Sequence, residues 1–561
     1  MDRDNEKNKG YSGKKPFEKK TYDKKPREFG AKREGKPFDK KPREFDKKSE
    51  GKSFDRKPRE FDKKNEGKPF DRKPREFDKK NEGKPFDRKP REVDKKNDSK
   101  SFDRKPREAK NGKGSGMDAR RVALNALADV NRVDAYASLA LDKRLREATL
   151  SPEDRRLATN IFYQAVENKL YIEYVLKDFV KVKPEPVVED ILHIACAQIL
   201  FMDRIPDHAA VDEAVKQTRA FGREEASGFV NGVLRSLLRA IEADEIKLPD
   251  TEAEPVKYLS VRYSVPETVI DRLIQAYGFE TAAEIVSYRP MERLETVRPN
   301  LMKTDYVSFE SFMDRRGWSW RKGTVDGAYL IERAGNLAGD PDFYDGLFSI
   351  QGESSMLSAR AVEAKPGMTI LDACAAPGGK SALMCEMMRG TGRVHAWDVH
   401  EHRVDLIKAM GKRLKLDNLR PAARDASVLR EELMGAMDAV LIDAPCSGLG
   451  VMTDKPDLKY RVTDESITSL IQMQKKILGA CASYVKRGGL LVYSTCSILP
   501  EENEKQIEAF LLSHPEFKME TKDTYLPDSL KPRLQNGMLS LIQSRDGVEG
   551  FFIARMRRTD L

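Results

Sequence analysis

Apolar residues recur at helical spacing over residues 117–241 and later, after a mixed stretch, in alternating strand and helix patterns. In the first stretch Ala123, Ala126 and Val130 lie three or four positions apart, which is the period of an amphipathic helix. The run SPED at residues 151–154 indicates a helix start, with a capping hydroxyl, a proline in the first turn and acids at the positive end of the dipole. The same period predicts further helices over 154–168, 171–179, 187–202, 209–221 and 226–240. We therefore expect an all-helical bundle in this part of the chain.

From residue 347 onward, short runs of β-branched and apolar residues alternate with helical periods. The runs predict strands over 369–373, 393–398, 439–443, 489–494 and 551–556. The helical periods predict helices over 354–363, 380–388, 403–414 and 467–485. This alternation is typical of a mostly parallel sheet covered by helices on both faces. The predicted fold class is therefore a Rossmann-like α/β domain with a doubly wound sheet, preceded by the helical bundle and a small α+β segment.

Between these stretches, residues 248–344 mix short helices with expected strands. Cations alternate there with aromatic residues, and Trp318 and Trp320 would face the same side of a strand. Two interpretations follow from this pattern. The rings form a base-stacking platform for RNA, or they belong to a hydrophobic core, which is the commoner role of tryptophans at this spacing.

The run TILDACAAPGGKS at residues 369–381 predicts a buried strand, a glycine turn and the start of a helix, in that order. This order opens the nucleotide crevice of doubly wound sheets. Glycine lets the backbone approach a ligand closely, and the N–H groups at a helix N-terminus attract a polar or anionic group. The run has no G-x-G-x-x-G pattern, and Cys374 stands where a phosphate-binding NTPase loop needs its first glycine. We expect a nucleoside-type cofactor here, with an NTPase as the weaker alternative.

Two acids after later strands could recognise such a cofactor. Asp398 closes the next strand, nineteen residues past Gly379, where a carboxylate can accept both hydroxyls of a ribose. The alternative for Asp398 is a cap of the following helix. Asp425, in the run ARDAS after a third strand, lies where an acid could accept a hydrogen bond from an adenine amino group.

Two cysteines also follow strands of the predicted sheet. The run LIDAPC delivers Asp443 and Cys446 to the carboxyl edge of the sheet, the run LVYSTC delivers Cys496, and adjacent strands would bring both thiols together. Enzymes that methylate an exocyclic amine usually carry N-P-P-Y or D-P-P-Y where this chain has the run DAPC. A thiolate can instead add to C6 of a pyrimidine and make C5 able to take a methyl group. The alternative is a pair of inert core cysteines, and this chemistry alone does not say which thiol attacks.

The other cysteines and the histidines indicate no disulfide or metal chemistry. None of the six cysteines forms a C-x-x-C pair, and the six histidines are scattered. Cys196, Cys385 and Cys481 lie within expected helices, so we predict structural roles for them and no bound metal. The chain has no run of about 18 apolar residues and no signal peptide pattern, and we expect a cytoplasmic protein.

The net charge of +10 is unevenly distributed along the chain. Residues 1–116 hold 42 Lys and Arg against 25 Asp and Glu, which leaves 60 basic and 67 acidic residues for the rest. This N-terminal tail repeats every 16 residues and has too few apolar residues to bury a core, so we predict disorder. Its aromatic positions are Phe38, Phe54, Phe70, Phe86 and Phe102. The tail could bind unpaired RNA bases and phosphates, or it could be a solvated spacer.

Two sets of runs carry a resemblance to known families. ARRVALNALADV, AYASLAL, IPDHAAVDEAVKQTRAFG and GFVNGVLRSLLR resemble the NusB RNA-binding domain, which implies contact with RNA, although such a bundle could also be a docking module. LDACAAPGGK, DAPCSGLG, YSTCSILPEENE and DGVEGFFIAR are similar to the Sun/RsmB family of bacterial rRNA cytosine-C5 methyltransferases. The similarity follows the family's domain order. It predicts a NusB-like domain at 117–245, a connecting domain at 246–345 and a methyltransferase domain at 346–561.

The resemblance also implies roles for individual residues. The residues implied to bind S-adenosylmethionine are Cys374, Ala375, Ala376, Pro377, Gly378, Gly379, Lys380, Asp398, Asp425 and Asp443. Cys496 would be the nucleophile and Cys446 would help to release the product, while Lys380 and Asp443 would also reach the flipped cytosine. Lys455-Pro456-Asp457 departs from the His-Pro-Asp expected in many relatives, and the tail has no counterpart in the family pattern.

The implied function is the transfer of a methyl group to C5 of a cytosine in small-subunit (16S) rRNA, by a monomer without a metal. The catalytic motifs would look the same in a tRNA methyltransferase, and it is the NusB-like domain that favours rRNA. A different class of function is that of a non-catalytic RNA-binding or antitermination factor. The presence of both thiols, the glycine turn and three acids argues against it.

Overall fold

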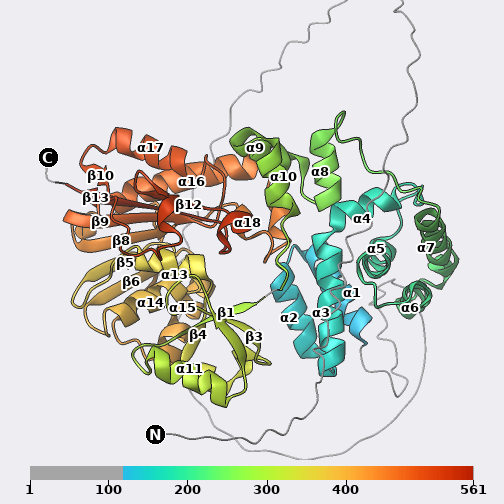
Figure 1. Ribbon diagram of the computed structural model, residues 1–561, viewed down its shortest axis with the longest axis horizontal. Helices are drawn as coiled ribbons and strands as arrows, with labels where there is room; N and C mark the ends of the chain where they lie inside the picture. The colour runs from blue at the N-terminus through green and yellow to red at the C-terminus, as the bar shows by residue number, and fades with distance from the viewer. Residues whose placement is uncertain (1–117, 293, 560–561) are drawn as a thin grey trace, which may run out of the picture. The chain divides into compact units, whose positions relative to one another are not determined.

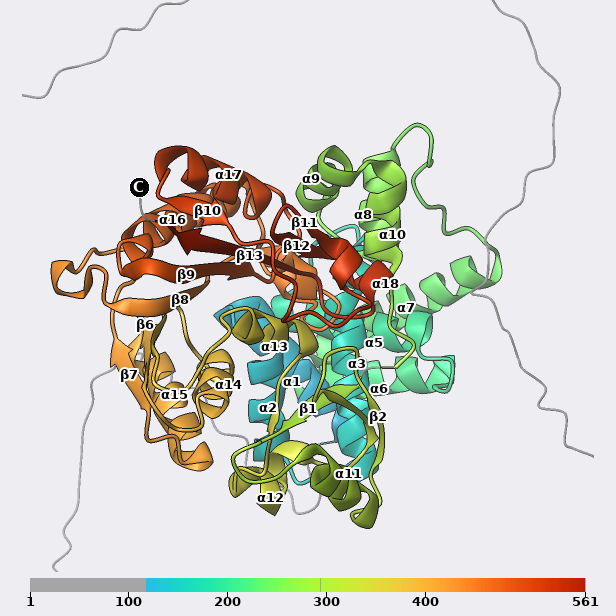
Figure 2. The same cartoon turned by 60° about the vertical axis from the view of Figure 1, so that its left-hand side comes forward.

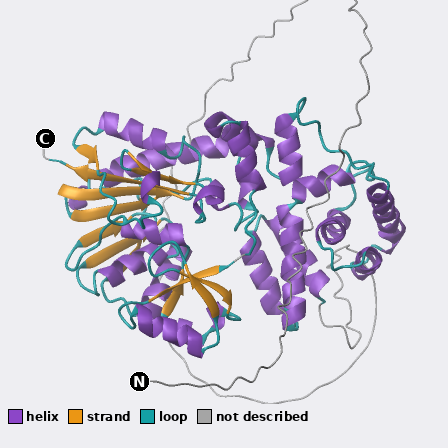
Figure 3. Cartoon of the chain, viewed as in Figure 1, coloured by secondary structure: helices purple, strands orange, loops and turns teal. Residues whose placement is uncertain are grey.

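The computed structural model describes residues 118–292 and 294–559 (Figure 1). The repeat tail at 1–116, with the predicted disorder and both interpretations of its function, lies outside these residues. The described chain begins with an all-helical bundle (Figure 3), in agreement with the apolar period. Its helices are α1 (Ala119–Val133), α2 (Ala137–Glu147), α3 (Pro152–Glu167), α4 (Lys169–Leu176), α5 (Pro186–Phe201), α6 (Asp207–Ala220) and α7 (Ser227–Glu242).

The start of α3 shows how local sequence sets a helix boundary. Ser151 accepts a hydrogen bond from the backbone N–H of Asp154 (3.0 Å), and Pro152 is the first helical residue. Proline is tolerated there because the first N–H groups of a helix have no partner within it. Large apolar side chains such as Phe162 and Ile172 are completely buried, so the apolar faces of the helices form the core of the bundle.

Three helices follow the bundle and support the later part of the chain. They are α8 (Pro255–Tyr263), α9 (Glu267–Tyr277) and α10 (Phe279–Ser287). Their buried face, which includes Ile270, forms one hydrophobic cluster with Leu449 and Leu499. These two leucines lie in the loops that carry Cys446 and Cys496. The connecting helices therefore pack against both cysteine loops.

A small antiparallel sheet comes next, in the strand order β2-β3-β1-β4. Its elements are β1 (Glu295–Pro299), α11 (Tyr306–Arg315), β2 (Ser319–Lys322), β3 (Tyr329–Arg333), α12 (Pro341–Tyr344) and β4 (Phe348–Ile350). β4 lies beyond the domain boundary expected at 345 and pairs with β1. The expected domain boundaries otherwise stay predictions.

The two tryptophans of this region pack against aromatic side chains, with Trp318 buried and Trp320 partly exposed. Trp318 precedes β2, is 8% exposed and packs edge-on against Phe312 and Phe348. Trp320 lies within β2 and packs edge-on against Tyr329. The core interpretation is therefore confirmed for Trp318. The expectation that both rings lie on one strand is wrong, because β2 begins only after Trp318.

The C-terminal part forms a nine-stranded sheet (Figure 2). Its main path has the order β11-β12-β13-β9-β8-β5-β6-β7, and β10 pairs with β13. The strands are β5 (Thr369–Asp372), β6 (Arg393–Asp398), β7 (Leu419–Ala423), β8 (Met437–Asp443), β9 (Val485–Thr495), β10 (Phe517–Met519), β11 (Leu534–Gln535), β12 (Met538–Leu541) and β13 (Phe551–Arg558). β5 to β9 pair in parallel and confirm the doubly wound fold. The sheet as a whole is mixed, because β10 to β13 add antiparallel pairs to this parallel part.

Helices cover both faces of this sheet, with α16 and α17 on one side and α14 and α15 on the other (Figure 1). The helices are α13 (Glu353–Arg360), α14 (Gly379–Met387), α15 (Glu401–Leu414), α16 (Asp464–Ala482), α17 (Glu504–Ser513) and α18 (Gln543–Asp546). Successive strand residues enter opposite hydrophobic clusters, as Ile370 and Leu371 of β5 do. This follows from the two-residue period of a strand. No helix among the described residues is long and apolar enough to cross a membrane.

A loop that follows the first cysteine, residues 455–461, is tied to the turn between α1 and α2. Asp457 accepts a hydrogen bond from the backbone N–H of Ala137 (3.1 Å). Arg461 forms an ion pair with Asp134 (3.0 Å) and donates to its carbonyl oxygen (3.0 Å). The helical bundle therefore helps to hold a segment next to the sheet edge.

Lys459 lies buried in this contact and donates a hydrogen bond to the carbonyl oxygen of Glu167 (2.9 Å). Burial, reinforced by the nearby charge of Arg289, lowers the pKa of this lysine to about 7. A lysine in an unfolded chain has a pKa of about 10.4. Between these two values the unfolded chain binds more protons than the folded one, so the free energy of unfolding rises with pH. Below a pH of about 7, Lys459 is charged in both the folded and the unfolded chain. The full cost of burying this charge then lowers the free energy of unfolding.

We expect the substitution Lys459→Met to lower the slope of the free energy of unfolding against pH by about 1 kcal/mol per pH unit. Urea unfolding of the variant and the wild type at a series of pH values above 7 measures the difference. Lys475→Met, which alters an exposed lysine of α16, is the matched control and should follow the wild type. Parallel pH curves for Lys459→Met and the wild type would contradict the prediction.

Candidate active site

The sheet places the candidate residues at its carboxyl edge, around the point where the strand order reverses. From β5 the chain moves to β6 and β7 on one side and then to β8 and β9 on the other. The loops after β5 and β8 therefore leave in opposite directions, which is the arrangement that binds ligands in doubly wound sheets. The loop after β5 is the glycine turn, and the loops after β8 and β9 carry the two cysteines. The residues predicted from separate motifs thus meet at one edge.

The glycine turn is shaped by its neighbours in the sheet. The backbone N–H of Ala375 donates to the carbonyl oxygen of Trp397 (2.7 Å), which joins the turn to the end of β6. Gly378 has a φ of 110°, in the left-handed region, and a Cβ there would lie 3.4 Å from the backbone of Ile407. This glycine therefore serves the conformation of the turn and its packing against α15. Because α14 begins at Gly379, the N–H groups of its first turn, which lack partners within the helix, follow directly.

The two acids expected to recognise a cofactor differ in their surroundings. Asp398 is buried, accepts a hydrogen bond from the backbone N–H of His400 (3.1 Å) and forms an ion pair with Arg403 (3.3 Å). It thus holds the turn before α15 and lies at the end of β6. Asp425 is exposed, and hydrogen bonds from the hydroxyl (2.7 Å) and N–H (2.8 Å) of Ser427 lower its pKa.

Asp372, at the end of β5, is a site residue for which the sequence pattern predicts no role. It is completely buried, and its Oδ2 accepts a hydrogen bond from the hydroxyl of Ser381 (2.6 Å). Its Oδ1 has no hydrogen-bond partner among the described residues, and burial raises its pKa to about 7. A buried acceptor with an unused oxygen suits a polar ligand group. The available signal was its position, as an acid that ends a strand directly before the glycine turn.

Lys380 and Asp443 form an ion pair between the glycine turn and the first cysteine loop. The lysine Nζ lies 2.7 Å from Oδ2 of Asp443, whose Oδ1 accepts a hydrogen bond from the hydroxyl of Ser494 (3.0 Å). Ser494 is the register partner of Asp443 on β9. Burial alone would lower the pKa of Lys380, but the carboxylate of Asp443 outweighs it and the pKa is raised. Lys380 is therefore a charged hydrogen-bond donor at this edge.

The two thiols at the strand ends lie in contact. The Sγ atoms of Cys446 and Cys496 are 3.3 Å apart, and both cysteines are free. The parallel pairing of β8 with β9 brings them together, as predicted from adjacent strands. Both side chains are partly exposed, whereas Cys196, Cys385 and Cys481 are completely buried. A pair of partly exposed thiols at a ligand-binding edge does not fit the interpretation as inert core residues.

The charges around this pair make its two sulfurs unequal. The hydrogen bond from Cys446 lowers the pKa of Cys496 against the opposing effects of burial and of the charge of Asp443. The charges of Lys380 and Lys455 lower it further. The same hydrogen bond raises the pKa of Cys446, as do burial and the charge of Glu502. Cys496 is therefore favoured as the thiolate and Cys446 as the thiol that donates to it. The motif chemistry alone leaves this order open.

These contacts decide between the alternatives for the glycine turn. Lys380 is paired with Asp443 of the first cysteine loop, and Cys374 stands where an NTPase loop needs its first glycine. Buried acceptors beside the turn suit the hydroxyl and amino groups of a nucleoside, and a thiolate next to them suits a reaction with an electron-poor base. Within residues 118–292 and 294–559, no three His, Cys, Asp or Glu side chains are grouped to hold a metal ion. The fold and site define an S-adenosylmethionine-dependent methyltransferase.

Comparison with known proteins shows which family of methyltransferases the chain belongs to. The family model for 16S rRNA methyltransferase RsmB/F matches residues 359–557, and the NusB family model matches residues 117–239. A protein of Bacillus subtilis (strain 168), named probable ribosomal RNA small subunit methyltransferase B, is 38% identical over 446 residues, covering 78% of this chain and 98% of the relative. The chain therefore belongs to the RsmB/F family, and its cofactor is S-adenosylmethionine.

Two further relatives agree with this placement. A protein of Synechocystis sp. with the same name is 31% identical over 448 residues, which cover 79% of this chain and 100% of the relative. The crystal structure of PH0851 has a TM-score of 0.68 at 26% identity and covers 78% of this chain and 98% of that chain. The similarity thus includes the helical bundle, the connecting helices and the large sheet together.

Proposed function

We propose that this protein, a monomer in the cytoplasm, methylates C5 of a cytosine in small-subunit rRNA through a covalent bond between Cys496 and C6 of the base. The observation that supports this most is the thiol pair beside the glycine turn, with its sulfurs 3.3 Å apart and Cys496 favoured as the thiolate. The names of the relatives support the class of RNA. The match to the NusB family supports contact with RNA by the helical bundle.

A nucleophile is needed because C5 of a cytosine does not by itself attack a methyl donor. The thiolate of Cys496 adds to C6, so that an S–C6 bond forms while the C5=C6 double bond opens and its electrons make C5 nucleophilic. S-adenosylmethionine, when bound, supplies the electrophilic methyl group that C5 takes. The target base must leave its stack to reach a thiol at the sheet edge.

Product release reverses the addition. The C5 proton is lost to solvent, its electron pair restores the C5=C6 bond, and the S–C6 bond breaks with the sulfur leaving as a thiolate. The thiol of Cys446 lies within hydrogen-bond distance of that sulfur and stabilises the negative charge. Because a sulfur with a lower pKa is the better leaving group, we assign Cys446 to product release.

The other predicted residues are assigned to the cofactor and to the target base. Residues 374–380, Asp398 and Asp425 would hold the cofactor, with Asp398 accepting hydrogen bonds from the ribose hydroxyls. Asp443 would lie between the cofactor and the cytosine. Asp372 adds a buried acceptor that suits the amino group of the cofactor, since its Oδ1 has no partner among the described residues. These acceptors match a cofactor whose hydroxyl and amino groups are hydrogen-bond donors.

Replacing Asp398 by asparagine is expected to weaken the binding of the cofactor about tenfold, because one charge-assisted hydrogen bond to the ribose is lost. Isothermal titration calorimetry with S-adenosylhomocysteine measures the affinity. Asp405→Asn, which alters an exposed acid of α15 paired with Lys408, is the matched control. An unchanged affinity of the Asp398 variant would argue against the ribose contact.

Bisulfite sequencing of cellular RNA tests the substrate and the methylated carbon together, because 5-methylcytosine resists deamination. RNA from cells that lack the protein should lose protection at a cytosine of 16S rRNA, and the full chain should restore it. Loss of protection in tRNA alone would replace rRNA as the substrate. Unchanged protection in all RNA would favour the non-catalytic RNA-binding factor.

A further inference from the structure

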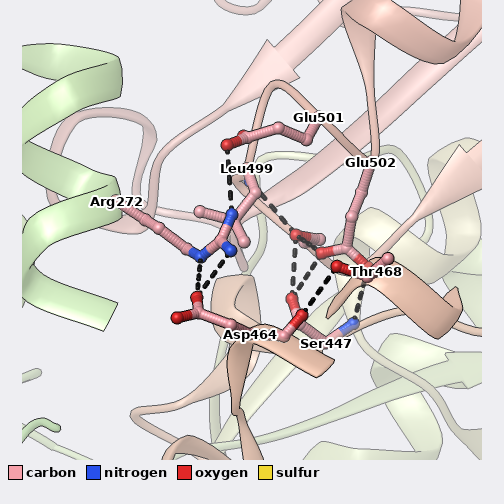
Figure 4. Close-up of polar contacts among 8 residues, drawn as sticks. Arg272, Ser447, Asp464, Thr468, Leu499, Glu501 and Glu502 are labelled. Carbon is pink, nitrogen blue, oxygen red and sulfur yellow. Dashed lines mark hydrogen bonds and ion pairs between the residues drawn. The ribbon is translucent and has the colours of Figure 1, made fainter. Parts of the chain in front are cut away.

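Glu502 is a completely buried carboxylate to which the proposed mechanism gives no role. It lies in the loop after β9, six residues beyond Cys496, and its side chain points toward Ser447 in the loop after β8 (Figure 4). Burying a carboxylate is costly unless its oxygens receive hydrogen bonds. The partners of Glu502 therefore indicate what it does.

Both oxygens of Glu502 receive hydrogen bonds from groups beside the two cysteines. Oε1 accepts from the backbone N–H of Ser447 (2.9 Å) and from Nε2 of Gln474 (3.0 Å). Oε2 accepts from the hydroxyls of Ser447 (2.5 Å) and Ser497 (2.5 Å). Gln474 also donates to the carbonyl oxygen of Pro445 (2.9 Å), so it ties the same loop a second time.

Two serines connect the carboxylate of Glu502 to the residues that carry the sulfurs. Ser447 directly follows Cys446, and Ser497 directly follows Cys496. Their hydroxyls lie 3.0 Å apart and share one oxygen of Glu502. A single carboxylate thus holds the residue that follows each cysteine, and the positions of these two residues help to set the separation of the sulfurs.

We propose that Glu502 is a positioning residue, which holds the thiols of Cys446 and Cys496 at their working distance through Ser447 and Ser497. This inference rests on the proposed function, since it concerns the same pair of thiols. The negative charge of Glu502 adds a second effect. Together with the hydrogen bond to Cys496 and burial, it raises the pKa of Cys446 and so favours the thiol that donates to Cys496.

The adjacent residue Glu501 provides a matched control. Its carboxylate forms an ion pair with Arg272 of α9 (3.3 Å), and the same arginine pairs with Asp464 at the start of α16 (2.6 Å; Figure 4). The partner of Glu501 is therefore a connecting helix and not a cysteine loop. Glutamine at this position makes the same chemical change one residue away from Glu502.

The test compares Glu502→Ala, Glu502→Gln and Glu501→Gln in the full chain. Alkylation of each thiol by iodoacetamide is followed across pH without RNA, with mass spectrometry to resolve the two cysteines. Methyl transfer to 16S rRNA gives kcat and KM. These readouts separate thiol chemistry from RNA binding and from stability, which a melting curve measures in parallel.

Glu502→Ala should lower kcat by about 10²-fold with KM unchanged, because the reacting groups are misplaced. The pH midpoint for alkylation of Cys496 should rise by about one unit, since the donor thiol moves away. Glu502→Gln keeps hydrogen-bonding groups and loses the charge, so the alkylation midpoint of Cys446 should fall. Glu501→Gln should match the wild type in every readout.

Wild-type alkylation profiles and kcat in both Glu502 variants would overturn the positioning role. If Glu502→Ala loses its cooperative melting transition, the alkylation profile of Glu502→Gln decides alone. Because the alkylation arm uses no RNA, shifted profiles in an enzyme that fails to methylate C5 would support the positioning role and reject the proposed function. If the enzyme methylates C5 but the alkylation profiles do not change in the Glu502 variants, the proposed function stands and the positioning role is overturned.

Discussion

Replacement of Cys496 by alanine is expected to abolish methyl transfer, with a loss in kcat of at least about 10⁴-fold, as for other attacking nucleophiles. Without this sulfur no bond to C6 forms, and C5 stays too weakly nucleophilic to take the methyl group. Cys446 is a poor substitute. Its hydrogen bond to Cys496 is gone, but burial and the charge of Glu502 still raise its pKa and disfavour its thiolate.

The rate of transfer of labelled methyl groups from S-adenosylmethionine to 16S rRNA measures this loss, and a denaturing gel should show no protein–RNA adduct. Cys196→Ala is the control for the removal of a thiol, because Cys196 is completely buried in the helical bundle. This variant should retain methyl transfer. A Cys496→Ala protein that still methylates RNA would show that another group attacks C6.

Replacement of Cys446 by alanine is expected to leave the protein covalently attached to its RNA. The nucleophile is intact, so addition to C6 still occurs. The donor at 3.3 Å from its sulfur is lost, so the pKa of Cys496 rises and its thiolate becomes a poorer leaving group. The adduct should therefore accumulate while turnover falls. Denaturing gels with end-labelled RNA, run over a time course with the cofactor present, measure the fraction of RNA that is bound.

The conservative variant Cys446→Ser tests the reason for this effect. A serine hydroxyl can still donate a hydrogen bond to the sulfur of Cys496, so its adduct should resolve faster than that of Cys446→Ala. The double variant at both cysteines should form no adduct. An adduct in the Cys496 variant together with none in the Cys446 variant would reverse the two assignments.

Local patterns predicted the helices and central strands because their causes are local. α3 begins at the run SPED, and β6 spans the residues expected for it. The antiparallel edge of the sheet was missed, although Asn536-Gly537 between β11 and β12 is a strong hairpin signal. Both residues have positive φ, 52° and 81°, as a tight hairpin turn requires. The predicted doubly wound sheet is confirmed, and the antiparallel edge adds to its parallel strands.

The candidate site was predictable as a set of residues but not as a set of contacts. Cys446 and Cys496 are 50 positions apart in the chain, and their meeting could be expected because parallel neighbours end at the same edge. Asp372 has only its position before the glycine turn as a signal, and Glu502 has only its place in the run YSTCSILPEENE. Their roles come from burial and from hydrogen bonds to segments far along the chain, such as that from Ser447 to Glu502.

The order of apolar and polar residues establishes the helical bundle, the doubly wound sheet and the presence of two thiols at its edge, because the periods of helices and strands are properties of short segments. Which thiol ionises depends on the folded chain. The hydrogen bond between the two thiols is the largest cause of both pKa shifts. The charges of Lys380 and Lys455 add to the shift of Cys496, and the charge of Glu502 adds to that of Cys446. Charges act through distance in space and through burial, and both are determined only when the loops after β8 and β9 pack together.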